Sequence, residues 1–153
     1  MKKVLNLVLV IVIICICFVG CKVKKTPQTP ESFTTIMEYN GFRVSDATEN
    51  VDTDTPITNA LIATNDDFKI QFYQFKDAEA GRVMIEYIEE GFNQISINFS
   101  VVKVNEPDYG YYAFADETKF YMVTHLDNTL LYCVTDKEYE DDVVRIIEKL
   151  GYR

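Results

Sequence analysis

The side chains best suited to acid–base or nucleophilic chemistry are His125, the single histidine, and Cys133, the one cysteine after residue 21. His125 precedes an Asp127-Asn128 turn, and the local sequence supplies neither the oriented partner nor the nucleophile that a general base needs. Cys133 lies in an apolar Leu-Tyr-Cys-Val segment, where a free cysteine acts as a small buried hydrophobe. The sequence therefore favours a non-enzymatic role. One alternative is an envelope enzyme, or its accessory subunit, that uses Asp, Glu and Tyr groups. Another is a structural spacer in a membrane complex.

Two acidic clusters have the residue types of a cation site. The acidic residues between Asp46 and Asp54 lack the glycine and the terminal glutamate of a calcium-binding EF-hand loop. The acidic run at 138–142 lies where a helix is predicted to begin, and carboxylates stabilise the positive end of the helix dipole there. The sequence has no zinc-ligand spacing and no glycine-rich phosphate-binding loop. We expect no metal ion and no cofactor.

Aromatic residues are concentrated in the predicted strands, and the chain has 10 Tyr and 10 Phe. Successive side chains of a strand point to opposite faces, so these rings lie on both faces of the sheet. Rings on a face that no helix covers would form a surface for a protein, peptide or cell-wall ligand. The alternative is that the rings form cross-strand pairs within the core. The candidate binding surface consists of Tyr73, Tyr109, Tyr111, Tyr112 and Tyr121.

The N-terminus has the parts of a bacterial export signal. Two lysines precede an almost wholly apolar run from Val4 to Val19, which leads into Phe18-Val19-Gly20-Cys21. This last segment resembles the lipobox of bacterial lipoproteins. The resemblance implies diacylglycerol transfer to the Cys21 thiol, cleavage between Gly20 and Cys21, and an anchor on the extracytoplasmic face of the cell membrane, detectable by palmitate labelling. The alternative is an uncleaved membrane helix that ends at Cys21.

Residues 21–29 are predicted to be the lipidated cysteine and an extended tether, because the segment is rich in lysine and contains proline. Residues 30–153 are predicted to form a single domain, since this length and an apolar content of 48% suffice for one core. The formal net charge of −9 gives no electrostatic footprint for nucleic acid. The general plan also resembles that of small, uncharacterised lipoproteins of Gram-positive bacteria.

The patterns predict an α+β fold, with an antiparallel sheet built from hairpins and three helices packed on it. The helices are expected to end at a glycine followed by an aromatic residue, and Asp77 and Asp136 to cap the second and third. Their predicted ranges are about 30–40, 77–90 and 137–150. Turn-forming residues separate the strands, which are predicted at 57–64, 68–75, 95–104, 109–115, 119–125 and 129–135, with a loop at 46–56.

Residues 62–92 align without a gap on residues 122–152, and both segments have the order strand, strand, helix. A duplicated β-β-α unit would produce this pattern. Because few residues are identical, convergence on the same order explains it equally well.

Overall fold

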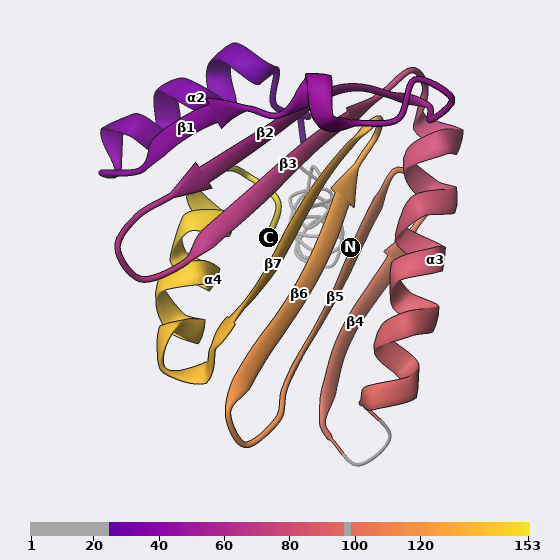
Figure 1. The fold of residues 1–153 in the computed structure, drawn as a ribbon. Helices are drawn as coiled ribbons and strands as arrows, with labels where there is room; N and C mark the ends of the chain where they lie inside the picture. Colours follow the sequence, from indigo (N-terminus) through magenta and orange to yellow (C-terminus); the bar gives the residue numbers. More distant parts are fainter. Residues whose placement is uncertain (1–24, 97–98) are drawn as a thin grey trace, which may run out of the picture.

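The computed structural model describes residues 25–96 and 99–153. The predicted signal peptide, the cleavage site at Gly20 and the lipid-bearing Cys21 lie outside the described residues. In the described part, a seven-stranded antiparallel sheet packs against three α-helices, so the predicted α+β class is confirmed (Figure 1). None of the helices in this part is long and apolar enough to cross a membrane.

The sheet has the strand order β1-β2-β3-β7-β6-β5-β4, and every neighbouring pair is antiparallel. The middle strand is β7, and its pairing with β3 joins two strands that are far apart in the sequence (Figure 1). The strands are β1 Arg43–Asp46, β2 Ile57–Thr64, β3 Lys69–Phe75, β4 Val101–Glu106, β5 Tyr109–Ala115, β6 Lys119–Leu126 and β7 Thr129–Asp136. The short polar β1 was not predicted. The connection between β1 and β2 contains a 3-10 turn, Thr48–Asn50.

The first helix of the described chain, α2, spans Pro30–Tyr39 as predicted. Thr29 caps it, because its side chain accepts a hydrogen bond from the Ser32 backbone N–H while the Ser32 side chain accepts one from Thr29. The helix stops at Gly41, whose φ of +87° suits glycine best, and Phe42 N–H then donates to Met37 O over 3.0 Å.

The last helix, α4, spans Glu140–Lys149 and ends as expected at Gly151, whose φ is +81°. Its beginning differs from the prediction. A 3-10 turn, Lys137–Tyr139, precedes the helix, and the Asp136 side chain makes no capping hydrogen bond. The predicted cap at Asp136 is therefore wrong.

The middle helix, α3, spans Ala78–Ile95 and is capped by Asp77, whose Oδ1 accepts from Ala80 N over 2.8 Å. The expected stop at Gly91 is wrong, since the helix runs through it. Phe92, the next residue, packs edge-on against Phe114 with ring centroids 5.6 Å apart. This burial holds the chain helical beyond Gly91, and β4 consequently begins later than predicted.

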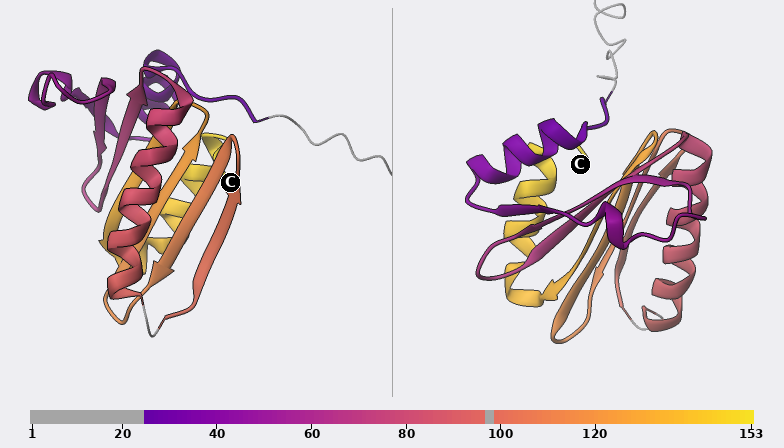
Figure 2. Two further views of the ribbon diagram at one scale, coloured as in Figure 1. Left: turned by 90° about the vertical axis from the view of Figure 1, so that its right-hand side faces the viewer. Right: turned by 45° about the horizontal axis from the view of Figure 1, so that its top comes forward.

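The helices cover the two faces of the sheet unequally (Figure 2). On one face, α2 and α4 bury a large core that includes Phe33, Met37 and Ile147. On the other face, α3 alone buries a smaller core through Ile85 and Phe92. A single helix cannot cover seven strands, so part of this second face stays open beside α3.

Candidate functional site: a groove between α3 and the sheet

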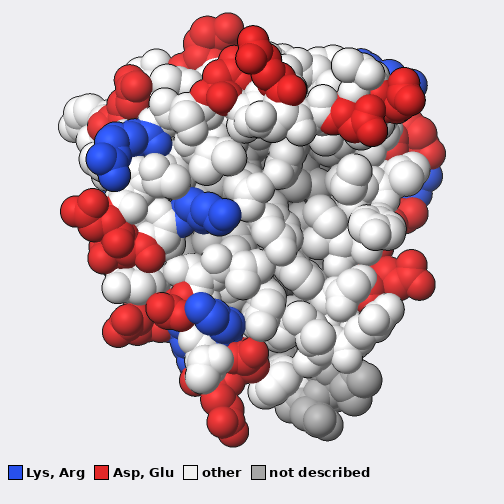
Figure 3. Space-filling model, viewed as in Figure 1, with Lys and Arg blue, Asp and Glu red and all other residues white. Residues whose placement is uncertain are grey.

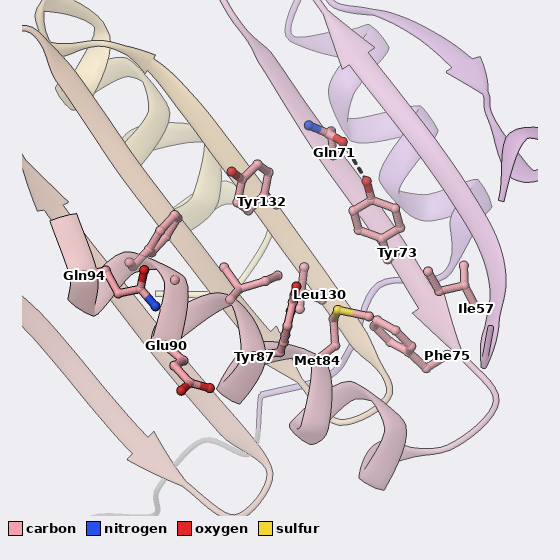
Figure 4. Close-up of a pocket in the computed structure, with 13 residues that line it drawn as sticks. Ile57, Gln71, Tyr73, Phe75, Met84, Tyr87, Glu90, Gln94, Leu130 and Tyr132 are labelled. Atoms are coloured by element: carbon pink, nitrogen blue, oxygen red, sulfur yellow. Dashed lines mark hydrogen bonds between the residues drawn. The ribbon is translucent and has the colours of Figure 1, made fainter. Parts of the chain in front are cut away.

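The open part of the second face forms a groove of about 660 Å³ between α3 and strands β3 and β7 (Figure 4). This volume is within the range of sites for small molecules and short polymer segments. The groove is lined by Ile57, Gln71, Tyr73, Phe75, Met84, Tyr87, Ile88, Glu90, Gly91, Phe92, Gln94, Leu130 and Tyr132.

The floor of the groove comes from the central strand pair. Tyr73 lies opposite Leu130 and Gln71 lies opposite Tyr132, and directly paired residues of antiparallel strands point to the same face. Tyr73 Oη donates a hydrogen bond to Gln71 Oε1 over 2.6 Å, which orients both side chains (Figure 4). Two half-buried phenol rings and one side-chain amide are thus presented together.

The two floor tyrosines are uncharged at neutral pH. Burial raises the pKa of the Tyr73 phenol above its ordinary value, and the nearby Tyr132 raises it further. Burial likewise raises the pKa of Tyr132. Each phenol therefore keeps its proton. Tyr73 donates that proton to Gln71 and can accept a further hydrogen bond, whereas Tyr132 can both donate and accept.

The wall of the groove is one side of α3, where Met84, Tyr87, Ile88 and Gly91 follow helical spacing. Tyr87 is 73% exposed although it belongs to this apolar side. At Gly91 the wall recedes, because an added β-carbon would have no other atom within 4 Å.

The charge around the groove is low for so acidic a chain. Among the 13 lining residues, Glu90 is the only one with a charged side chain at neutral pH, and Gln71 and Gln94 supply amides. Figure 3 shows that acidic side chains gather toward the margins of this face, whereas a largely uncharged area lies between them. The groove is thus suited to an uncharged ligand with some polar groups.

Of the five tyrosines predicted to form a surface, Tyr73 alone lines the groove. Tyr121 lies on the same face, but its ring stacks on Phe114 with centroids 4.6 Å apart, and its Oη donates to Asp116 Oδ2 over 3.2 Å. Tyr112 is 2% exposed beneath α3 and donates to Asn93 Oδ1 over 2.7 Å. Tyr112 therefore holds the helix on the sheet and is not part of an exposed surface.

The other two tyrosines lie on the opposite face. Tyr111 is 3% exposed, within the core that α2 and α4 cover. Tyr109 is half-buried, with Lys25 Nζ 3.6 Å from its ring centroid. The five tyrosines thus do not share one face of the sheet, since alternation along β5 sends Tyr109 and Tyr111 to one face and Tyr112 to the other.

Three groove residues were not predicted from the sequence to bind a ligand: Tyr87, Tyr132 and Gly91. Tyr87 falls at helical spacing with the apolar residues Val83, Met84 and Ile88, so the sequence pattern predicted a core residue, whereas the buried residues of α3 are Gly81, Ile85, Glu89 and Phe92. Tyr132 alternates with Leu131 and Cys133 in β7, and this alternation was the available signal that it points away from them. The sequence around Gly91 indicated only the end of a helix, and nothing in it pointed to a binding site.

His125 and Cys133 lie apart from the groove lining. His125 is buried, which lowers the pKa of its imidazole, and its Nδ1 has no hydrogen-bond partner within the described residues. Cys133 is buried as predicted, and burial raises the pKa of its thiol to about 12. The described part of the chain holds no group of three or more His, Cys, Asp or Glu side chains placed to bind a metal ion.

The acidic residues near Asp46 serve as local turn acceptors. Asp46 Oδ1 accepts from the Thr48 N–H over 2.8 Å, and Asp52 Oδ1 accepts from the Asp54 N–H over 3.1 Å. These bonds stabilise the polar connection between β1 and β2.

No protein-family model and no curated protein matches the chain. Among solved structures, it is similar to a GTP binding regulator from Thermotoga maritima, with 12% sequence identity and a TM-score of 0.48. The match covers 82% of this chain and 88% of the other. Similarity at this level supports no statement on function.

Proposed function

We propose that the protein is a lipoprotein of the bacterial envelope, anchored through Cys21 on the extracytoplasmic face of the membrane, and that it binds a ligand in the groove beside α3. The observation that carries the binding role is the groove itself, a tyrosine-lined hollow with Glu90 as the only Asp, Glu, Lys or Arg in its lining, in a chain of net charge −9. No specific observation favours the alternatives of an enzyme subunit or a structural spacer.

The start of the described chain supports an orientation for the anchored domain. Lys25 lies over Tyr109, and Gln28 Nε2 donates to Leu150 O over 3.0 Å, so this segment is held on the side of α2 and α4 (Figure 2). Lys25 follows Cys21 by four positions in the sequence, which allows a reach of about 14 Å at most. A lipid on Cys21 would therefore keep the domain close to the bilayer, with the groove on the face away from it.

The anchor is tested by palmitate labelling of cells that express the full chain. We expect labelled protein in the membrane fraction, and a Cys21→Ser variant that is unlabelled and keeps its signal peptide. Cys133→Ser is the matched control, since it removes the buried thiol and should label normally. Labelling that survives Cys21→Ser would refute the anchor.

The binding role is tested by thermal denaturation of the full-length protein in mild detergent with metals, sugars, peptidoglycan fragments and short peptides. A ligand of the native state raises the melting temperature in a saturable way. We expect such a rise for at least one organic ligand, and its loss in Tyr132→Ala. A rise that Tyr132→Ala leaves intact places the ligand outside the groove.

The similarity of segments 62–92 and 122–152 is best explained, we propose, by convergence. Three observations support this. The strands occur in mirrored order, β2-β3-β7-β6, while α3 and α4 lie on opposite faces, and no rotation relates two such units. The aligned residues Phe72 and Tyr132 also point to opposite faces. Homologous sequences in which the two segments are more similar to each other than they are in this chain would argue for duplication.

A further inference from the structure

We propose that the ligand of the groove is a neutral glycan, and that one of its sugar rings packs directly against the helix backbone at Gly91. This inference rests on the proposed binding role of the groove and names the chemical class of the ligand.

Gly91 is the first observation. A glycine inside a helix makes the helix less stable than an alanine would, because glycine loses more backbone conformational freedom on folding. The other glycine of α3, Gly81, has a packing reason, since a β-carbon there would lie 3.1 Å from Asp127 O and 3.5 Å from Phe75. A β-carbon at Gly91 would meet open space in the groove. No contact within the described chain requires glycine at this position, whereas a ligand lying against the helix would.

The side chains of the groove are those that sugars require. A pyranose ring has apolar C–H faces that pack on aromatic rings, and Tyr73, Tyr87 and Tyr132 supply such rings. Its hydroxyl groups both donate and accept hydrogen bonds. The Tyr132 phenol and the amides of Gln71 and Gln94 do the same, and Tyr73 Oη, which donates its proton to Gln71, can still accept one from a sugar hydroxyl.

An extended peptide fits the groove less well. A peptide that binds a sheet pairs its backbone with a free strand edge. The floor strands have none, because β3 pairs with both β2 and β7, and β7 pairs with both β3 and β6. The backbone amides of a buried peptide would have only a few side chains to bond.

An anionic polymer is disfavoured by charge. Among the described lining residues there is no Lys or Arg to pair with a phosphate or carboxylate, and Glu90 would repel one. Uncharged sugars avoid this cost in a chain of net charge −9.

The test is binding of the full-length protein in mild detergent to an array of neutral oligosaccharides built from hexose and N-acetylhexosamine units, followed by titration of the best one. Uncharged decapeptides are titrated in parallel. The variants are Tyr87→Ala and Gly91→Ala in the groove, and Tyr39→Ala as the matched control. Tyr39 is also a helix tyrosine, 90% exposed, but it lies on α2 at the opposite face.

We expect saturable binding of a neutral oligosaccharide that weakens about tenfold or more in Tyr87→Ala and in Gly91→Ala, since even one misplaced methyl group costs this much in a fitted site. Tyr39→Ala should bind as the wild type does. Gly91→Ala should also have a raised melting temperature, which separates its loss of binding from misfolding.

Three results would overturn the inference. Absence of binding to every oligosaccharide of the array excludes a neutral glycan. Peptide binding that Tyr87→Ala abolishes, without any glycan binding, keeps the groove as a binding site but replaces the ligand class. Glycan binding that is insensitive to both groove variants places the sugar site elsewhere and removes the groove from the account.

Discussion

Gly110 lies directly opposite His125 in the β5–β6 ladder, so close that a β-carbon on Gly110 would stand 2.6 Å from His125 Cδ2. The same β-carbon would lie 3.1 Å from Ile85 Cδ1 of α3. The imidazole therefore fills the space that a side chain at 110 would need. This packing beneath α3 gives the single histidine a structural role.

Gly110→Ala should lower the free energy of unfolding by about 1–3 kcal/mol, the usual cost of forcing extra atoms into a packed core. Urea denaturation followed by circular dichroism measures the change. Gly81→Ala is a graded comparison, because the nearest atom to its β-carbon is 3.1 Å away and less displacement is required. An unchanged midpoint in Gly110→Ala would show that His125 moves aside freely.

Acidification should destabilise the protein through His125. Burial lowers the pKa of its imidazole in the folded state, so between that pKa and the unfolded value of about 6.5 the unfolded chain binds more protons. Stability is thus complete above about pH 6.5 and is lost as the pH falls toward the folded pKa, with a slope of at most about 1.4 kcal/mol per pH unit.

Urea midpoints between about pH 7.5 and about pH 5 measure this slope. The pKa of Asp116 is held below its ordinary value by backbone N–H donors, so such carboxylates titrate below this range. His125→Gln should remove the slope, whatever its effect on overall stability. A slope that persists in this variant would assign the titration to another group.

Gly91→Ala should raise the free energy of unfolding by about 0.5–1 kcal/mol, because alanine is the better helix former and its β-carbon meets no other atom. The same denaturation experiment measures it. A destabilised Gly91→Ala variant would mean that the groove wall is packed more tightly than the structure shows, and would remove the reason to assign Gly91 to a ligand.

Tyr112→Phe should cost about 1–3 kcal/mol of stability. The lost hydroxyl donates to Asn93 Oδ1 and lies 3.0 Å from Ser96 Oγ, the buried residue at the end of α3. Tyr121→Phe is the matched control. Its hydroxyl bonds a carboxylate at the surface, so we expect a change within about 0.5 kcal/mol. Equal effects of the two variants would contradict the anchoring role of Tyr112.

The three Gly-aromatic pairs show what local sequence can and cannot predict. Gly41 and Gly151 end their helices as expected, with positive φ values. Gly91 is likewise followed by an aromatic residue, yet its helix continues. Phe92 packs as part of the helix into an aromatic cluster with partners on strands β5, β6 and β7, whereas Phe42 and Tyr152 are buried after their helices have ended. Those contacts come from tertiary structure, which no local pattern contains.

The groove was only partly predictable for a related reason. Alternation along a strand predicts which tyrosines share a face, and it correctly separates Tyr111 from Tyr112. Which face stays open depends on the pairing of β3 with β7 and on the side that α3 takes. Tyr73 and Tyr132 are brought together only by that pairing, and Tyr87 joins them only because α3 lies alongside.

The most direct test of the groove as the ligand site is cross-linking in living cells. A photoreactive benzoylphenylalanine is placed at position 87 in the groove and, in a matched strain, at position 39 on the far side. After irradiation, mass spectrometry of the purified protein reports the mass added at each position. We expect sugar-containing adducts on α3 at position 87 and none at position 39. Sugar adducts at position 39 alone, or no sugar adduct at position 87, would contradict it.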